Sequence, residues 1–304
     1  MTRHAWQAPR RAEPKRSDPP GQSPSDLAPG LYVTATPIGN ARDVTLRALD
    51  VLAGVDLIAA EDTRVTAKLL AIYGLEKPLQ PYNDHNGAEQ RPRLLKRLRE
   101  GRRIALVSDA GTPLVSDPGY KLVRESVAQG IAVHAIPGAC APLAGLTLAG
   151  LPTDKFLFAG FLPTRAGERK TVLEGLKAVA ATLVFFESPQ RLGEALADLA
   201  GVLGPRPAAV TRELTKLHEE IRRGDLAALA AAYAGETPKG EITLVVGPPP
   251  AAEADMRKVD AALARALEFM PLRAAVDLVA EMLDAPRRDV YAHALKRKGD
   301  APQS

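Results

Sequence analysis

The stretch that most constrains the fold is Ser108–Gly119, with the sequence SDAGTPLVSDPG. It follows Ile104–Val107, an apolar run typical of a buried strand. Proline lacks an N–H and fixes φ, and glycine favours tight turns, so neither a strand nor a helix can continue through this stretch. The pattern predicts a structured loop at the carboxyl end of a strand, where open α/β sheets bind ligands. The alternative is a rigid turn with aspartate caps, which has a purely structural role.

Predicted strands and helices alternate along most of the chain, which indicates an α/β fold. We expect a first α/β domain over residues 30–150 and a second over 151–248, with the parallel and antiparallel shares left open. Residues 1–29 hold six prolines and five basic residues with almost nothing to bury, which predicts a disordered, weakly basic tail. Beyond a proline-rich linker, residues 255–300 predict three short helices with a basic last one, as in a helix-turn-helix module. A plain helical bundle or a dimer contact fits that pattern equally well.

Composition excludes several classes of protein. The net charge of +4 is compatible with a polyanionic partner but does not require one. Aromatic residues make up only 4% of the chain, which disfavours a surface built on rows of base-stacking rings. A single cysteine, Cys140, rules out a disulfide framework and any multi-cysteine metal site, so we expect a reducing, cytoplasmic location and no metal. No apolar run reaches the roughly 20 residues of a membrane span, and no membrane partner is expected.

Polar residues follow several of the predicted strands. Glu61, Asp62 and Arg64 come directly after the strand 57–60, either as a capped helix start or as part of a polar site. His85 lies in a polar loop, where it is a proton acceptor or a solvated side chain. The helix predicted over 90–102 carries a row of arginines and lysines, which is either a solvated face or a phosphate-binding one.

Seven collinear motifs make these weak signals specific. In chain order they are Thr36–Asn40, Glu61–Arg64, Ser108–Pro113, Ser116–Gly119, Pro137–Gly138, Glu187–Pro189 and Arg212–Lys216. Together they resemble the tetrapyrrole methylase family, and more closely its bacterial branch that modifies RNA. The resemblance covers Leu31 to Lys298 and leaves the first 29 residues outside.

The resemblance implies a class III methyltransferase fold: two α/β domains with a small C-terminal helical module, and S-adenosyl-L-methionine as methyl donor in a cleft between the domains. It implies that the acceptor is the ribose 2′-hydroxyl of a cytidine in the decoding region of 16S rRNA, in the small ribosomal subunit. It also implies a homodimer. The family's donor-binding positions correspond here to Pro37, Asp109, Ala110, Gly111, Val115, Cys140, Ala141, Phe186 and Gly240.

Methyl transfer from a sulfonium is an in-line displacement, so the protein must align sulfur, methyl carbon and acceptor oxygen. The hydroxyl must also lose its proton, to which a nearby carboxylate or imidazole contributes as general base. Asp62, Glu61, Asp109 and His85 are the candidates, and we favour the Glu61–Asp62 pair, with Arg64 holding a carboxylate or a phosphate. Similarity to the family assigns the acceptor side to Arg212, Glu213 and Lys216. A tetrapyrrole-type methyltransferase and a non-catalytic RNA-binding protein are the rival interpretations.

Overall fold

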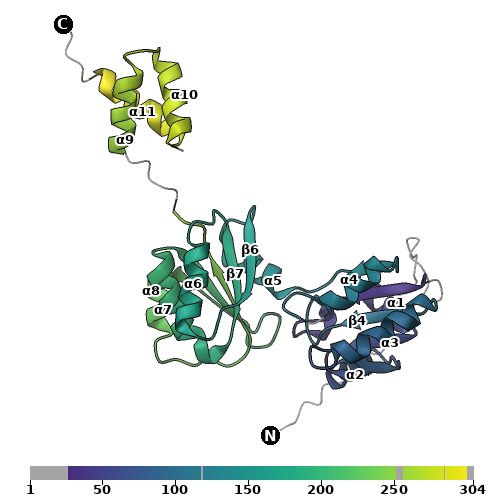
Figure 1. Ribbon diagram of the computed structural model, residues 1–304. Helices are drawn as coiled ribbons and strands as arrows, with labels where there is room; N and C mark the ends of the chain where they lie inside the picture. Colours follow the sequence, from purple (N-terminus) through teal and green to yellow (C-terminus); the bar gives the residue numbers. More distant parts are fainter. Residues whose placement is uncertain (1–26, 118, 251–255, 284, 300–304) are drawn as a thin grey trace, which may run out of the picture. The chain divides into compact units, whose positions relative to one another are not determined.

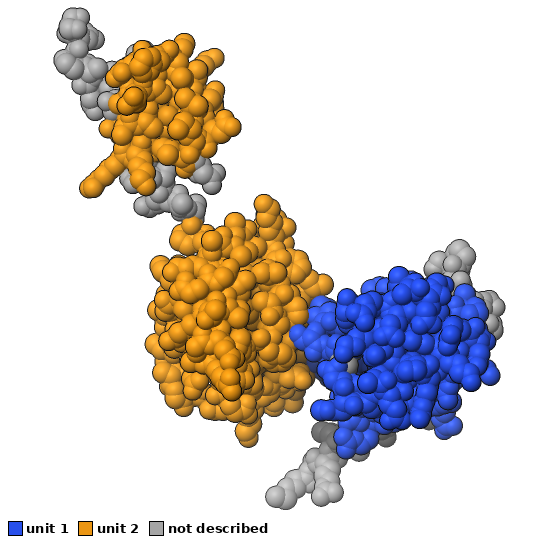
Figure 2. Space-filling view, viewed as in Figure 1, with its two compact units in different colours: residues 1–140 blue, residues 141–304 orange. Residues whose placement is uncertain are grey.

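The computed structural model describes residues 27–117, 119–250, 256–283 and 285–299. Most of the predicted tail, residues 1–26, lies outside the described residues. The chain divides into two compact units, residues 1–140 and residues 141–304 (Figure 2). Each unit is built around its own sheet.

The first unit is a five-stranded sheet in the order β3-β2-β4-β1-β5, in which every neighbouring pair is parallel (Figure 1). Its strands are β1 (Gly30–Thr34), β2 (Leu57–Ala60), β3 (Leu79–Pro81), β4 (Arg103–Val107) and β5 (Val133–Ile136). Its helices are the 3₁₀ turn η2 (Ala41–Asp43), α1 (Leu46–Gly54), α2 (Thr63–Ile72), α3 (Gly87–Arg99) and α4 (Tyr120–Ala128).

Helices cover both faces of this sheet, which is why its central strands are continuous apolar runs. Leucines of α3 and α4 pack on one face against side chains such as Leu31 and Ile104. Residues of α1 and α2 pack on the other face against Ile58 and Ala105. Because all five strands run the same way, the loops that follow them gather at one edge of the sheet, the carboxyl edge.

The predicted basic helix is displaced toward the N-terminus. α3 ends at Arg99 rather than at Arg102, and Arg103 already begins β4. The reason is local: the backbone N–H of Arg103 donates to the Asp56 carboxylate at 2.8 Å, and its guanidinium pairs with the same side chain. The chain therefore leaves the helix at Gly101, whose φ of +81° favours glycine.

The second unit holds a mixed five-stranded sheet in the order β6-β7-β10-β8-β9, parallel only between β6 and β7. Its strands are β6 (Phe156–Phe161), β7 (Thr182–Glu187), β8 (Pro207–Arg212), β9 (Glu220–Asp225) and β10 (Ile242–Val246). The helices beside it are α5 (Ala141–Ala149), α6 (Ala166–Leu176), the 3₁₀ turn η3 (Pro189–Arg191), α7 (Leu192–Leu203) and α8 (Leu226–Ala232). The last strand in sequence, β10, lies at the centre of the sheet and is buried throughout.

The boundary between the units falls between Cys140 and Ala141, earlier than the boundary at residue 150 that the sequence predicts. Helix α5 belongs to the second unit because its apolar side packs on the second sheet. Leu146 and Ala149 pack with Val184, Ala209 and Val245 of β7, β8 and β10. The small residues at the start of α5, such as Gly145, therefore allow close packing against a sheet.

Residues 256–299 form three helices, α9 (Met256–Ala266), α10 (Leu272–Met282) and α11 (Arg287–Gly299). They share a core of their own, which includes Val259, Leu263, Val276, Val279 and Val290. The module therefore buries its own apolar side chains.

Replacing Gly145 in α5 tests this packing, because the expected change in the free energy of unfolding is opposite to the usual one for glycine in a helix. Replacing glycine by alanine inside a helix ordinarily stabilises it by roughly 0.5–1 kcal/mol. A Cβ on Gly145, however, would lie 2.9 Å from Thr243 Cγ2 and 3.3 Å from Thr211 Oγ1. We expect Gly145→Ala to lower the free energy of unfolding, because the crowding of α5 against β10 outweighs the helix preference. Urea denaturation measures it.

Gly201→Ala in α7 is the matched control, since a Cβ there meets nothing within 4 Å. It should be neutral or stabilising. A stabilising Gly145→Ala would contradict the close approach of α5 to the second sheet.

Candidate active site at the carboxyl edge of the first sheet

The loops after β1 and β4 are joined by a pair of backbone hydrogen bonds. The Thr36 N–H donates to the Gly111 carbonyl at 2.8 Å, and the Gly111 N–H donates to the Thr36 carbonyl at 3.0 Å. The Thr36 hydroxyl also donates to the Ser108 carbonyl, at 3.2 Å. The Thr112 hydroxyl donates to the Ala139 carbonyl at 3.1 Å, which brings in the segment after β5. Pro37, Gly111 and Cys140, predicted to bind the donor, thus lie on loops that are tied to one another.

The central loop is held in a strained backbone. Gly111 has φ +80°, and a Cβ there would approach Ile38 Cγ2 to 3.3 Å. Two non-glycine residues of the same loop, Leu114 and Ser116, also have positive φ, at +75° and +66°. Such conformations cost of order 1–3 kcal/mol each and persist where the surroundings over-determine them, often at functional sites. Val115, another predicted donor-binding residue, lies between these two.

Carboxylates link the ends of β2 and β4. The Asp62 N–H donates to Asp109 Oδ1 at 2.9 Å, and the Asp109 N–H donates to Glu61 Oε2 at 3.3 Å. The Asn83 amide adds a hydrogen bond to the Glu61 carbonyl at 3.3 Å, which ties in the loop after β3. Glu61, Asp62 and Asp109, which lie far apart in sequence, are therefore neighbours, as the prediction of a common polar site requires.

These acidic side chains raise one another's pKa. Burial is the main cause for both Glu61 and Asp109, whose pKa values lie above their usual range. Asp117 is affected most: burial raises its pKa to about 6, helped by the charges of Glu61 and Asp109 and opposed by a hydrogen bond from the Ser108 hydroxyl. Sequence reasoning assigned no role to Asp117. Its place between two turn residues in the central loop was the available signal.

Asp62 behaves differently from its neighbours. It is the N-cap of α2, accepting a hydrogen bond from the Arg64 N–H at 2.8 Å, and its carboxylate also accepts from Arg64 Nε at 3.0 Å. The Arg64 guanidinium lowers the pKa of Asp62 to about 2. A carboxylate that holds its proton so weakly is a poor proton acceptor near neutral pH. Asp62 is therefore the capped helix start of the first sequence interpretation, while its backbone N–H donates to Asp109 of the polar site.

His85 is connected to the site only through its backbone N–H. Its N–H donates to Asn83 Oδ1 at 3.1 Å, and the residue is exposed. Within the described residues, no hydrogen bond or ion pair joins its imidazole to Glu61, Asp62 or Asp109.

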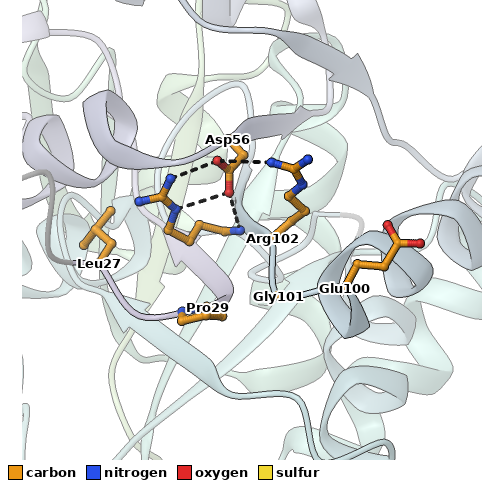
Figure 3. A pocket seen from close by; sticks show the side chains of 7 residues that line it. Leu27, Pro29, Asp56, Glu100, Gly101 and Arg102 are labelled. Atoms are coloured by element: carbon orange, nitrogen blue, oxygen red, sulfur yellow. Dashed lines mark hydrogen bonds and ion pairs between the residues drawn. The ribbon is translucent and has the colours of Figure 1, made fainter.

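A cavity at the opposite, amino edge of this sheet is a separate feature (Figure 3). Asp56 lies between Arg102 and Arg103 there, and the pairing with Arg103 lowers the pKa of Asp56 to about 2. Asp56 is already paired with both arginines, and none of the predicted site residues lines the cavity.

In the second unit, the predicted acceptor-side residues form one ionic cluster. Arg212, at the end of β8, donates to the Glu220 carboxylate through Nε at 3.0 Å and Nη2 at 2.8 Å. Lys216 Nζ bonds the Glu213 carboxylate at 2.8 Å, which lowers the pKa of Glu213. Gly240 packs against that glutamate so closely that a Cβ would lie 2.4 Å from its Oε1. The structure thus brings Arg212, Glu213, Lys216 and Gly240 together.

Phe186 lies elsewhere on the second sheet, paired with Thr243 of β10 and in ring contact with Phe158 and Phe161 of β6. It is partly buried. Ala141 begins α5. These two positions and Gly240 belong to the second unit, so their shared role with the first unit stays a prediction.

Comparison with known proteins identifies the family. Residues 30–230 match the family described as Tetrapyrrole (Corrin/Porphyrin) Methylases, and residues 251–298 match the RsmI C-terminal HTH domain. This chain belongs to the tetrapyrrole methylase family. The expected fold class is confirmed, with the C-terminal helices as its third part.

Curated proteins share about half of their aligned residues with this chain. A protein of Mesorhizobium japonicum named ribosomal RNA small subunit methyltransferase I is 51% identical, over 90% of this chain and 93% of its own. A protein of the same name from Escherichia coli O157:H7 is 43% identical, over 91% of this chain and 99% of its own.

Solved structures of other proteins share the fold at lower identity. Uroporphyrin-III-C-methyltransferase from Thermus thermophilus is 25% identical, with a TM-score of 0.53 over 71% of this chain and 93% of that one. A diphthine synthase is 16% identical, with a TM-score of 0.56 over 71% of this chain and 89% of that one. In the described part of the chain, no helix is long and apolar enough to cross a bilayer, and no three potential ligand side chains are grouped to hold a metal.

The raised pKa of Asp117 leads to a prediction about the stability of the protein. A carboxyl group with a raised pKa binds more protons in the folded state than in the unfolded state, so its contribution is favourable below about pH 4 and is lost as the pH rises through about 6. We expect Asp117→Asn to stabilise the protein at pH 7 by about 1–2 kcal/mol, after allowance for partial exposure of the side chain. Urea denaturation at pH 5 and pH 7 measures it.

Asp84→Asn, at an exposed loop position near the same site, is the control and should leave stability almost unchanged. If Asp117→Asn destabilises the protein equally at both pH values, the Asp117 side chain acts as an ordinary hydrogen-bonding residue and the proposed burial cost is wrong.

Proposed function

We propose that this protein transfers a methyl group from S-adenosyl-L-methionine to the ribose 2′-hydroxyl of a cytidine in 16S rRNA of the small ribosomal subunit. The observation that carries the proposal is the 51% identity over nine-tenths of the chain with a protein named for this ribosomal RNA. Family membership supports the methyl transfer itself.

The residues of the first unit fit the donor. S-adenosyl-L-methionine carries a cationic sulfonium, and the carboxyl edge holds Glu61, Asp109 and Asp117 with raised pKa values, an environment that a positive charge relieves. The tied loops offer main-chain groups at Pro37 and Ala110 for the uncharged parts of a nucleoside, whereas the N–H and carbonyl of Gly111 already pair with Thr36. Close backbone approach there depends on glycine at position 111, where φ is +80°.

We assign donor binding to Pro37, Asp109, Ala110, Gly111, Val115 and Cys140 in the first unit. Ala141, Phe186 and Gly240 remain predicted contributors from the second unit. When bound, the donor supplies an electrophilic methyl carbon. The chain must hold that carbon in line with the acceptor oxygen and exclude competing water.

The remaining task of the chain is to accept the proton of the ribose hydroxyl. Of the favoured Glu61–Asp62 pair, we now assign the proton to Glu61. Its pKa is raised, whereas that of Asp62 is lowered to about 2 by Arg64. We assign Asp62 and Arg64 to orientation: together they cap α2 and fix the Asp109 side chain through the Asp62 N–H.

The acceptor side belongs to the second unit in this proposal. Arg212, Glu213 and Lys216 form an ionic cluster, so a phosphate would exchange with an internal carboxylate there rather than meet a free cation. We also propose a cytoplasmic location, which a ribosomal RNA acceptor supports.

A homodimer is the quaternary structure that we propose. Strand β6 is an edge strand of its sheet and exposes Phe156 and Phe161, with 43% and 57% of their surfaces accessible. Apolar side chains on an open edge favour pairing with another chain.

A tetrapyrrole-type methyltransferase is the rival function. It is supported by the family description and by the solved uroporphyrin-III-C-methyltransferase, but at 25% identity rather than 51%. A non-catalytic RNA-binding protein would keep the fold without the donor.

A labelling experiment separates these functions. With labelled S-adenosyl-L-methionine, the purified protein should methylate 30S subunits or 16S rRNA that lack the modification, and nuclease digestion should place the label on a cytidine ribose. Uroporphyrinogen III is the matched small-molecule substrate. Label on the tetrapyrrole alone would overturn the RNA assignment, and failure to bind the donor in calorimetry would favour the non-catalytic protein.

Two substitutions separate donor binding from turnover. Asp109→Ala should abolish donor binding, because it removes both a carboxylate that would stabilise the cationic donor and the acceptor of the Asp62 N–H. Glu61→Gln should keep donor binding within a few-fold while turnover falls by about 10²–10⁴, the usual contribution of a general base. Calorimetry and single-turnover rates measure the two effects.

Asp62→Ala is the comparison. It should slow turnover less than Glu61→Gln, since Asp62 orients rather than accepts. A larger loss of turnover in Asp62→Ala, with donor binding intact, would return the base to Asp62.

A further inference from the structure

The acidic carboxyl edge raises a question about RNA. Glu61, Asp109 and Asp117 repel phosphates, and the acceptor-side cations Arg212 and Lys216 are already paired with carboxylates. Affinity for RNA comes mainly from cations that neutralise phosphates. A tight complex therefore needs another cationic surface.

Helices α3 and α4 of the first unit supply one. Together they carry seven basic and two acidic side chains, a net charge of +5, against +4 for the whole chain. Helices α6, α7 and α8 of the second unit carry two basic and four acidic side chains. Helices α9, α10 and α11 together carry nine basic and four acidic side chains, also a net charge of +5. The excess of positive charge is thus divided between α3 and α4 and the C-terminal helices rather than spread over all helical surfaces.

The two helices form a single surface. Both pack on the same face of the first sheet, through Leu94, Leu98 and Leu122 (Figure 1). An ion pair of 2.7 Å between Arg91 and Glu125 joins them and uses the more buried arginine of α3. Six cations remain on the outside, which we call the basic surface: Arg93, Lys96, Arg97, Arg99, Lys121 and Arg124.

The cations of the basic surface are only weakly engaged. Arg93 and Lys96, with side chains 65% and 73% exposed, have single partners on their own helix, at 3.1 and 4.0 Å. Among the described residues, Arg99 and Lys121 have no anionic partner. Exposed pairs of this kind contribute about 0–1 kcal/mol, so exchanging them for phosphate costs little. The helix dipole accounts for cations in the last turn of α3 but not for Arg93, Lys121 or Arg124.

We infer that the basic surface on α3 and α4 binds the phosphate backbone of the RNA substrate, apart from the site of methyl transfer. The inference rests on the proposed function for the identity of the RNA. It assigns affinity to this surface and chemistry to the carboxyl edge, so its loss should weaken RNA binding without changing donor binding.

The test uses the full chain with Arg93→Gln, Lys96→Gln and Arg99→Gln combined. RNA binding is measured by anisotropy with a 16S rRNA fragment at several salt concentrations. Each lost phosphate contact should reduce the slope of log K against log salt by about 0.7–0.9, so we expect a reduction of about 2. The KM for 30S subunits should rise about tenfold or more, with kcat and the donor Kd unchanged.

The matched control removes three exposed cations from around α6, combining Arg165→Gln, Lys170→Gln and Lys177→Gln. It changes the net charge equally and should alter the slope and KM by less than about twofold. An equal effect in both variants would show a general charge effect and overturn the inference, as would an unchanged slope in the α3 variant.

The two proposals fail in different ways. If the wild-type protein methylates no RNA, the proposed function fails, while the salt dependence of RNA binding still tests the basic surface. If the wild-type protein methylates RNA and the α3 variant keeps its KM, only the basic surface is wrong.

Discussion

The two hydrogen bonds between Thr36 and Gly111 are the constraint on which the site depends. They form an isolated antiparallel bridge between the loops that follow the parallel strands β1 and β4. Each loop thereby provides hydrogen-bond partners for a backbone N–H and a carbonyl of the other. Such partners are needed because buried backbone polar groups are costly when they are left unpaired. Asp109 lies two residues before Gly111, and backbone N–H groups hold its carboxylate and that of Glu61 in place. A site whose groups are held by main chain needs little reorganisation when a ligand arrives.

The first unit also carries its negative and its positive charges on different surfaces. A cationic methyl donor is stabilised by carboxylates, whereas an RNA acceptor is held by cations, and one surface cannot satisfy both. The carboxylates lie at strand ends, where burial and mutual repulsion raise their pKa values. The cations lie on the outer face of α3 and α4, where water screens their repulsion. A parallel sheet provides this separation without further elements, because its loops and its helix faces are different surfaces.

Much of this arrangement could be predicted from the sequence. Apolar runs located most of the strands, and the prolines and glycines of Ser108–Gly119 located the central loop. Residues near strand ends met because parallel strands share an edge, which is how Glu61 and Asp109 became neighbours. Other features were not predictable locally. The central place of β10 depends on long-range antiparallel pairing, the assignment of α5 depends on the surface it packs against, and positive φ at Leu114 and Ser116 carries no sequence signature without glycine.

Asp62 and Glu61 show why residue type alone does not assign a general base. Both are carboxylates at the end of the same strand, and the sequence offers no reason to separate them. They differ in their relation to helix α2. Asp62 is the N-cap of α2 and accepts a hydrogen bond from the Arg64 N–H, whereas Glu61 lies between strand β2 and that cap. Capping and a nearby guanidinium favour the charged form of Asp62, whereas burial beside other carboxylates favours the neutral form of Glu61. Proton transfer is efficient when the acceptor's pKa approaches the working pH, so the start of a helix decides which of two adjacent acids is suited to the chemistry.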